Sequence, residues 1–308
     1  MHESKPSSGL SRERTLSSPH PRMRTSWHIR TRRGTNPAGE KNTLYRLAGG
    51  IVARVSRPGQ ADVARKETHV SRWLNQSGIP TVQLIAHIAQ PVEIEQQSVT
   101  FFWRELPPHR ATDLAQTAKV LRRIHALHPP NDFALPDLAP FVRLEQRITE
   151  AVVFFDSTQR RWLLSHLNSL VEQYEDRPPG LLPSPVHGDA GGGNIVATFA
   201  QPTPIVLDLE RFAYGPPEWD LTSIAVSCFT FGSIATAEWR RFSSGYGHDV
   251  TEWAGYPLLR SIRELRKKVT FAAQVASQRQ DLATEAQYRL ACIQGEAGPR
   301  PWHWKPVP

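Results

Sequence analysis

The sequence is poor in cysteine, with only Cys228 and Cys292 among its 308 residues. The two lie far apart and form no Cys-x-x-Cys pair, which argues against a disulfide framework and against a cysteine-ligated zinc site. We therefore expect both thiols to be free and buried, in a protein of a reducing compartment.

Long apolar runs are also lacking. No stretch reaches the roughly 20 apolar residues that a membrane-spanning helix needs. No apolar core follows the first charged residues, as a secretory signal would require. The most apolar run, residues 221–237, is interrupted by serine and threonine and is typical of a buried helix. These absences predict a cytoplasmic protein without a membrane partner.

The net charge of +8 lies mostly in one segment. Residues 1–36 carry eight basic and two acidic residues, which leaves a net +2 for the rest of the chain. A basic segment rich in serine and proline can contact nucleic acid or anionic lipid, but such composition is more typical of disorder. We expect residues 1–36 to be a disordered basic tail and expect no nucleic-acid partner. Met23 lies inside this tail and is an alternative start to Met1.

Residues 37–106 combine strand and helix patterns and predict a small mixed lobe. Gly49 and Gly50 separate two strand-like runs and indicate a hairpin turn. Asp62 is the expected N-cap of the helix that follows, and Gly78 marks its end. The expected elements are two strands in 42–59, a helix in 61–80, and strands in 81–88 and 98–106 around a polar hairpin.

After a linker in residues 104–110 the patterns become mainly helical, which predicts a larger lobe in 107–308. The apolar stripe of its first helix consists of Leu114, Ala118, Leu121 and His125. The other expected elements are a proline-rich loop in 129–140, helices in 141–176, a β-like block in 183–212 and mainly helices from 217 onward. The sequence therefore predicts an α+β chain of two lobes.

The run VHGDAGGGN at residues 186–194 separates Asp189 from Asn194 by four residues. This is the spacing of the protein-kinase catalytic loop, where the aspartate accepts the acceptor's hydroxyl proton and the asparagine binds Mg²⁺. The runs NIVATF and PIVLDLE are expected to pair as a hairpin, which brings Asp208 beside Asn194. One carboxylate and one amide oxygen suit a hard cation that also takes phosphate oxygens. His-Gly-Asp alone also fits an Asx turn or a metal pair of a hydrolase.

Three segments resemble the aminoglycoside phosphotransferase and choline kinase superfamily of kinase-like small-molecule kinases. HGDAGGGN resembles its H-G-D-x-x-x-x-N catalytic loop, VLDLE its metal-binding segment, and YGPPEWDLTSIA its G-x-P-x-x-D-L element. The likeness extends over about 40–308, and residues 238–265 are also similar to actinobacterial members. It implies a bilobal protein-kinase-like fold, with a small mixed β/α N-lobe that binds nucleotide and a larger, mainly helical C-lobe.

The resemblance also implies roles for single residues. Asp189 would be the catalytic base or would orient the acceptor hydroxyl, and Asn194 and Asp208 would bind Mg²⁺. Supporting roles away from the chemistry are implied for His187, Glu210 and Asp220. Relatives often carry bulkier residues where this loop has three glycines, so we expect a loop that orders when Mg²⁺ and nucleotide bind.

A kinase also needs a strand cation that holds the α- and β-phosphates and a helix glutamate that fixes the cation. Arg54 in IVARVS stands where many relatives have lysine. Glu67 shares a helix face with Val63, Val70 and Leu74, and a carboxylate on an apolar face needs a partner. We expect an Arg54–Glu67 pair. The alternative is a solvated Glu67 paired with a neighbouring basic residue of its own helix.

No G-x-G-x-x-G run covers the phosphates. Asn42 and Thr43 are the candidates for phosphate contacts at the start of the small lobe. Residues 221–308 are net basic, which argues against a polycationic aminoglycoside acceptor. Most tryptophans of this region are expected to lie in the core.

The sequence thus predicts a phosphotransferase that moves the γ-phosphoryl group of ATP or GTP to a hydroxyl of a small molecule. The acceptor would be an antibiotic, an amino alcohol or a sugar-like metabolite, and Mg²⁺ would be the metal cofactor. The alternative is a non-catalytic, kinase-shaped module that binds nucleotide or ligand. A metal-dependent hydrolase that uses His187 and Asp189 is a third possibility.

Overall fold

The computed structural model describes residues 42–305, apart from 95, 103–104, 152–153, 192 and 201–202. The tail expected in residues 1–36 lies outside the described residues. The described residues form two compact units, the first built by residues 42–76 and Thr81–Pro108, the second by Ser77–Pro80 and residues 109–305. The predicted α+β class is confirmed, whereas the predicted lobe bounds at 106 and 107 stay a prediction.

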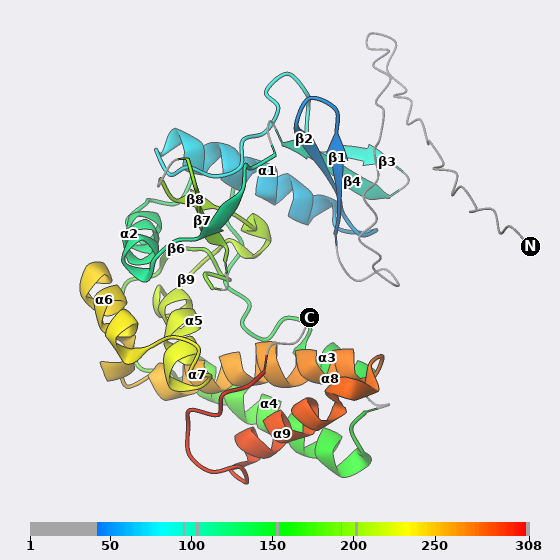
Figure 1. Cartoon of the computed structure of the whole chain (residues 1–308), viewed down its shortest axis with the longest axis vertical. Coiled ribbons are helices and arrows are strands. Elements are labelled where there is room, and N and C mark those ends of the chain that lie inside the picture. The colour runs from blue at the N-terminus through cyan, green and yellow to red at the C-terminus, as the bar shows by residue number, and fades with distance from the viewer. Residues whose placement is uncertain are drawn as a thin grey trace, which may run out of the picture. The chain divides into compact units, whose positions relative to one another are not determined.

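An antiparallel four-stranded sheet and one helix form the first unit (Figure 1). The sheet order is β1 (Thr43–Leu47), β2 (Ile51–Val55), β4 (Gln97–Phe102) and β3 (Val92–Ile94), and the helix is α1 (Ala61–Gln76). Gly49 and Gly50 take φ values of 78° and 69° in the turn before β2, where a side chain would be strained. Buried Leu47, Ala53 and Val99 form the small apolar core of the sheet.

Residues 81–88 were expected to be a strand, and this prediction is wrong. The buried side chains of the segment include Thr81 and Ile85, four positions apart, rather than alternate residues. The Ser71 hydroxyl of α1 donates a hydrogen bond of 2.7 Å to the Val82 carbonyl, so the segment is bonded to the helix. The third strand is β3 instead, inside the stretch expected to form a polar hairpin.

The start of α1 also differs from the expectation. The helix begins at Ala61, so Asp62 lies in its first turn rather than at the N-cap. The Asp62 carboxylate accepts a hydrogen bond of 3.1 Å from Arg65. A carboxylate near a helix N-terminus is favourable in either place.

The second unit contains two small sheets and most of the helices (Figure 1). One sheet has the order β5 (His109–Ala111), β7 (Ile195–Thr198), β8 (Ile205–Val206), and the other pairs β6 (Ser184–Val186) with β9 (Ala213–Gly215). The first helices are α2 (Leu114–His125), α3 (Leu144–Glu150) and α4 (Ser157–Glu175). They are followed by α5 (Glu218–Phe229), α6 (Thr236–Tyr246), α7 (Tyr256–Arg263), α8 (Thr270–Ala276) and α9 (Ala283–Gln294). A π-helical segment, η4 (Glu264–Val269), joins α7 to α8.

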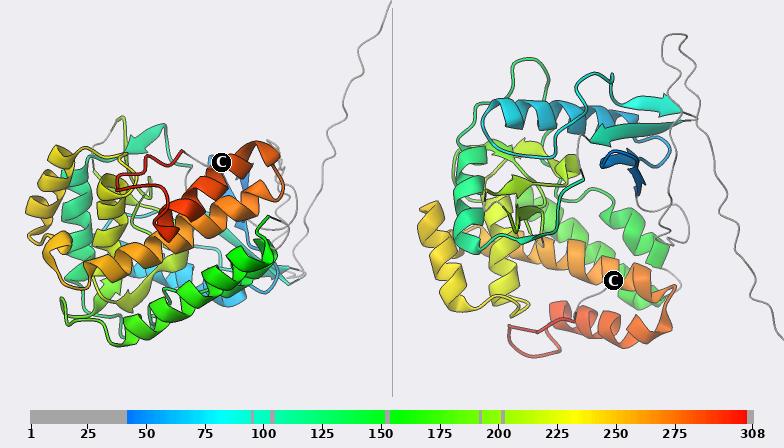
Figure 2. Two further views of the ribbon diagram at one scale, coloured as in Figure 1. Left: turned by 90° about the horizontal axis from the view of Figure 1, so that it is seen from below. Right: turned by 45° about the horizontal axis from the view of Figure 1, so that its top comes forward.

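Helix packing supplies the main core of the second unit. Figure 2 shows α8 with α9 beside it, and α3 also packs against α8. The buried residues of this core include Leu163 and Leu167 of α4, Trp219 of α5 and Leu259 of α7. α5 is buried on nearly every side, as its apolar sequence predicts.

The C-terminal segment is part of this core. Trp302 and Trp304 are buried and stack on each other with ring centroids 5.3 Å apart. The Trp302 backbone N–H donates to the Thr230 carbonyl at 2.7 Å, and Arg289 of α9 donates to the Lys305 carbonyl. The expectation that most tryptophans of residues 221–308 lie in the core is confirmed.

The cysteines and the apolar segments were also the subject of expectations. Cys228 and Cys292 are both free and buried, as expected. Within the described ranges, no helix combines the length and the apolar character that crossing a membrane requires.

Candidate active site

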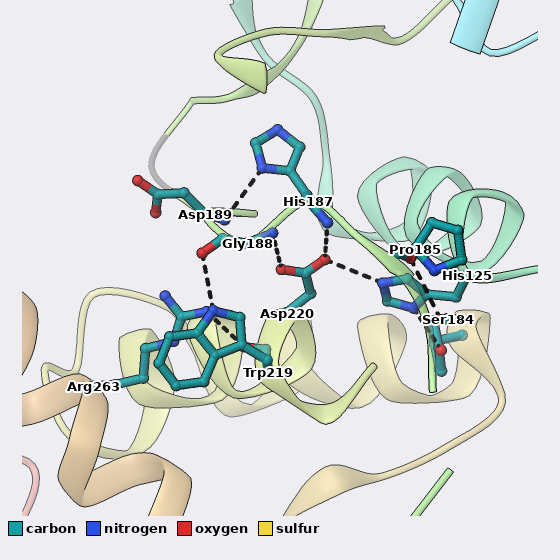
Figure 3. A network of polar contacts seen from close by, with 10 residues as sticks. His125, Ser184, Pro185, His187, Gly188, Asp189, Trp219, Asp220 and Arg263 are labelled. Carbon is teal, nitrogen blue, oxygen red and sulfur yellow. Dashed lines mark hydrogen bonds and ion pairs between the residues drawn. The ribbon is translucent and has the colours of Figure 1, made fainter. Parts of the chain in front are cut away.

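The loop that follows β6 is held from below by α5 (Figure 3). The backbone N–H of His187 donates to Asp220 Oδ2 at 2.7 Å, and that of Gly188 donates to Oδ1 at 2.9 Å. Both carboxylate oxygens of one α5 residue therefore fix two successive peptide groups immediately before Asp189. Hydrogen bonds to an ionised acceptor are about twice as strong as neutral ones, so this is a rigid attachment.

Asp220 is fully buried and stays ionised through its neighbours. Its Oδ2 also lies 3.1 Å from Nε2 of His125 on α2, and Nδ1 of the same ring lies 2.8 Å from the Tyr246 hydroxyl of α6. Burial alone raises the pKa of Asp220, but the His125 hydrogen bond and the charges of His125, His187 and Arg263 outweigh it and lower the pKa below its usual value. Three helices thus converge on one carboxylate.

Gly188 is required by its surroundings. Its φ is 79°, and a Cβ at this position would collide with the Arg211 carbonyl. Its carbonyl accepts a hydrogen bond of 3.0 Å from the indole nitrogen of Trp219, the neighbour of Asp220. The glycine therefore lets the loop approach both α5 and the segment after Asp208.

Asp189 joins this network through its backbone. The Asp189 N–H lies 3.3 Å from Nδ1 of His187, and its carbonyl accepts from Gly191 N–H and from Asn194 Nδ2, both at 2.8 Å. Figure 3 shows its carboxylate pointing away from Asp220. The side chain is only partly buried, so the loop presents a carboxylate whose backbone is fixed on both sides.

Asn194 and Asp208 lie at the same end of the β7–β8 hairpin. Ile195 pairs with Val206, and the Leu207 N–H donates to the Asn194 carbonyl at 2.8 Å. The expected hairpin is therefore present. The Leu207 carbonyl accepts from Nε2 of His187 at 2.8 Å, which joins this end of the hairpin to the Asp189 loop.

The two predicted metal ligands have the donors that Mg²⁺ prefers. Asp208 is exposed, and its backbone has the left-handed conformation with a φ of 54°. Asn194 donates a hydrogen bond from Nδ2 to the Asp189 carbonyl, which leaves its amide oxygen for a cation. Among the residues that the structure describes, no group of three or more histidine, cysteine, aspartate or glutamate side chains is placed to hold a metal. A site of one carboxylate and one amide fits an ion that completes its shell with water and phosphate. Metal binding by these residues stays a prediction.

The first unit contains the predicted Arg54–Glu67 pair. Arg54 Nη1 of β2 donates to Glu67 Oε1 of α1, and their side chains are 15% and 10% exposed. Val70 and Leu74 are fully buried on the same helix face, so Glu67 lies inward as its position predicts. Asn42 directly precedes β1. Phosphate contacts by Arg54 and Asn42, and a role of Glu67 in nucleotide binding through Arg54, stay predictions.

Sequence reasoning assigned no role to His125, although it placed the residue on the apolar stripe of α2. A histidine on that stripe and an aspartate in an apolar helix are a signal for a buried pair, because each needs a partner. Trp219 gave no such signal, since a tryptophan in an apolar helix fits a core position equally well.

The net charge of residues 221–308 is a poor guide to an acceptor site. Arg263, Arg266 and Arg289 are at least nine-tenths buried, and Arg300 forms a two-point ion pair with Glu264. These positive charges do not lie on an open surface. The charge of the acceptor therefore depends on where individual arginines lie rather than on the net charge of residues 221–308.

Residues 35–261 match the phosphotransferase enzyme family. A comparison with curated protein sequences finds no match.

Solved structures of kinases are similar to this chain over most of its length. The amicoumacin kinase hAmiN in complex with AMP-PNP, Ca²⁺ and Ami is 16% identical, with a TM-score of 0.62 over 85% of this chain and 88% of that chain. A choline/ethanolamine kinase family protein from Mesorhizobium loti is 15% identical, with a TM-score of 0.55 over 84% and 85%. The aminoglycoside phosphotransferase APH(3'')-Id from Streptomyces rimosus is 18% identical, with a TM-score of 0.54 over 77% and 92%. These likenesses confirm the predicted bilobal, protein-kinase-like fold.

Proposed function

Because the chain belongs to the phosphotransferase enzyme family, we propose that it transfers the γ-phosphoryl group of ATP or GTP to a hydroxyl group of a small molecule. The observation that carries this proposal is the fixed loop around Asp189. Its backbone is attached to Asp220 through the two preceding amides and to Asn194 through its own carbonyl, while its carboxylate points away from Asp220. A catalytic group needs such a rigid backbone and an accessible side chain.

Asp189 orients the acceptor hydroxyl and receives its proton. The bond between the γ-phosphorus and the β,γ-bridging oxygen breaks as the acceptor oxygen forms a new bond to that phosphorus. The products are a phosphate ester and the nucleoside diphosphate, and the hydroxyl proton passes to Asp189 and then to solvent. Catalysis of this transfer rests mainly on positioning and charge stabilisation.

Asn194 and Asp208 would hold Mg²⁺, which when bound neutralises charge on the phosphate oxygens. Asn194 serves two purposes, because its Nδ2 braces the Asp189 carbonyl while its oxygen remains for the ion. His187 braces the other ligand segment through the Leu207 carbonyl. The hydrolase alternative for His187 fits less well, because its ring is fully buried and contacts backbone groups through both nitrogens.

In the first unit, Arg54 would contact the nucleotide phosphates with Glu67 fixing its guanidinium. Arginine offers a planar, two-pronged donor where a lysine would offer a point charge. Of the similar structures, amicoumacin kinase contains AMP-PNP and APH(2")-IIia contains GDP and kanamycin. Both adenine and guanine nucleotides therefore belong in the donor test.

The decisive experiment is a screen of purified protein against alcohol-bearing metabolites and antibiotics, with ADP and GDP release as the readout. For any acceptor found, we expect Asp189→Ala to lower kcat by about a hundredfold to ten-thousandfold, the usual contribution of a positioned acid or base. Asp176→Ala removes an exposed carboxylate at the end of α4 and should leave kcat unchanged. Equal turnover by the parent and the Asp189→Ala protein would refute the assigned role.

A non-catalytic binding module predicts a different outcome. Such a protein would gain thermal stability from Mg²⁺ with nucleotide but would release no diphosphate with any acceptor. The presence of Asp189, Asn194 and Asp208 together favours the enzyme, because a binding module has no need of a proton acceptor.

A further inference from the structure

Three arginines of the second unit lie close together beside the Asp189 loop. Arg263 stacks on the indole ring of Trp219, with its guanidinium carbon 3.8 Å from the ring centroid, and donates to the Trp219 carbonyl at 2.7 Å. The Trp219 indole in turn holds the Gly188 carbonyl, and a Cβ on Gly188 would lie 3.0 Å from Cβ of Arg211. Arg263 and Arg211 thus both contact the Gly188–Trp219 pair, one residue before Asp189.

Arg266 lies three residues beyond Arg263 on η4. Its Nη1 donates to the Pro140 carbonyl at 2.6 Å, in the loop whose Leu138 N–H donates to the Tyr214 carbonyl of β9. β9 directly follows the segment that carries Arg211. We call Arg211, Arg263 and Arg266 the arginine cluster.

The positive charge of the cluster is only partly balanced by the described residues. In the part of the chain described, none of its three members forms an ion pair or a hydrogen bond with a carboxylate. Asp220 attracts Arg263, but its two oxygens are already occupied by two backbone amides and His125. Glu264, which follows Arg263 in the sequence, accepts hydrogen bonds from Thr230 and Arg300 instead.

Burial makes this arrangement costly. Arg263 is 1% exposed and Arg266 is 6% exposed. Nε and Nη1 of Arg263 are buried and have no hydrogen-bond partner among the described residues. Burial, together with the charges of Arg211, Arg263 and Arg147, lowers the pKa of Arg266 to about 8. Buried cations that repel one another and keep unused donors destabilise a fold unless an anion joins them.

We propose that the arginine cluster binds an anionic group of the acceptor, a carboxylate or a phosphate, while Asp189 orients the hydroxyl to be phosphorylated. Arg211 is the member that meets the ligand, since it is only partly buried and donates to no described residue. Arg263 and Arg266 add positive charge behind it. The acceptor is therefore an anionic alcohol, such as a hydroxy acid or a phosphorylated alcohol, rather than a polycation. The identification of the bound anion as the acceptor rests on the proposed phosphotransfer, whereas anion binding itself does not depend on turnover.

Anion binding can be measured without nucleotide or turnover. Malonate and inorganic phosphate would be titrated by calorimetry into the full chain, the Arg211→Gln variant and the Arg240→Gln variant. Arg240→Gln removes the same charge from an exposed position on α6 and is the matched control. We expect the parent and Arg240→Gln proteins to bind with equal Kd, and Arg211→Gln to bind about tenfold more weakly or worse, because a charged hydrogen bond is lost.

The two probes and a kinetic arm separate the possible ligands. Tighter binding of malonate indicates a carboxylate acceptor, and tighter binding of phosphate indicates a phosphorylated one. With Mg-nucleotide, a hydroxy acid should have a kcat/KM at least about tenfold above that of its neutral amide, and Arg211→Gln should raise the KM of the acid without raising the nucleotide KM.

Several results would overturn the inference. These are absence of binding to the parent protein, equal binding by the Arg211→Gln variant, or equal turnover of the acid and its amide. A raised nucleotide KM with an unchanged acceptor KM would assign Arg211 to the nucleotide instead. If anions bind through Arg211 but no alcohol is phosphorylated, the anion site stands and the proposed function fails. If neutral alcohols are phosphorylated and no anion binds, the reverse holds.

Discussion

Replacing Asp220 by asparagine is the most informative single change, because it keeps the shape of the side chain and removes only its charge and one acceptor. In the parent protein its two oxygens accept from His187 N–H, Gly188 N–H and His125. An asparagine has one acceptor oxygen, so one of the two backbone N–H groups must face an amide NH₂. The Asp220→Asn protein therefore contains a buried, unsatisfied donor directly under the catalytic loop.

The expected cost follows from these contacts. Leaving a buried donor unsatisfied costs about 1–3 kcal/mol, and the retained hydrogen bond loses the extra strength given by a charged acceptor. A hydrogen bond to a charged group contributes about 1.5–3 kcal/mol, and at least one such bond is lost. We expect the free energy of unfolding of the Asp220→Asn protein to fall by about 3–5 kcal/mol, a large part of the about 5–15 kcal/mol typical of a domain.

Urea unfolding followed by tryptophan fluorescence measures this change, since Trp219 itself contacts the loop. The control is Asp281→Asn, which removes a carboxylate that pairs with Arg279 at the surface and should cost less than about 1 kcal/mol. A loss below about 1 kcal/mol for Asp220→Asn, equal to the control, would refute the reasoning that Asp220 anchors the loop.

The pH dependence gives a second, independent test of Asp220. Its folded-state pKa lies below the unfolded value of about 3.9. The ionised carboxylate therefore contributes stability in full above about pH 5, and this contribution is lost as the pH falls through the lower, folded-state pKa. The stability difference between the parent and Asp220→Asn proteins should be constant from pH 7 to 5 and should shrink below pH 4. A difference that grows in acid would contradict the assigned direction.

Two further predictions concern the loop and the first unit. Gly188→Ala combines an unfavourable φ with a collision against a backbone carbonyl, so it should lose more than about 2 kcal/mol of stability in urea unfolding. The control is Gly298→Ala, because Gly298 also has a positive φ but has open space around it. It should lose only about 1–2 kcal/mol of stability. Equal losses in the two proteins would show that the collision does not contribute. Glu67→Gln should raise the nucleotide KM about tenfold or more in steady-state kinetics and leave the acceptor KM unchanged, because Arg54 loses its fixing partner. The control Glu93→Gln removes an exposed partner of Arg65 and should change neither KM. An unchanged nucleotide KM in the Glu67→Gln protein would show that the Arg54–Glu67 ion pair is not needed for nucleotide binding.

The features predicted correctly from the sequence are those that local pattern determines. The hairpin between Asn194 and Asp208 follows from two short β-branched runs across a turn, and its register places both residues at one end. The inward position of Glu67 follows from helical spacing alone. In both cases the relevant residues are fewer than fifteen positions apart, so no long-range packing had to be known.

The features that were missed depend on contacts between separate elements, whether near or far apart in the sequence. Residues 81–88 have the composition of a strand, but bonding to α1 decides their conformation. His125 and Tyr246 are 121 positions apart, and nothing in either local sequence indicates that they share a hydrogen bond. The arginine cluster is hidden for the same reason, because burial of individual arginines is a property of the packed helices. A sum of charges over residues 221–308 cannot reveal it.

The position of Trp302 and Trp304 has a consequence for synthesis of the chain on the ribosome. These rings fill the core of the second unit, and Trp302 is bonded to Thr230 at the end of α5. Translation delivers residues in order, so this core cannot close until Trp304 has emerged. The first unit draws its core from residues before position 109 and can fold earlier. Until then the apolar faces of α5 and α9 stay exposed in the nascent chain, so the second unit depends longest on protection from aggregation during translation.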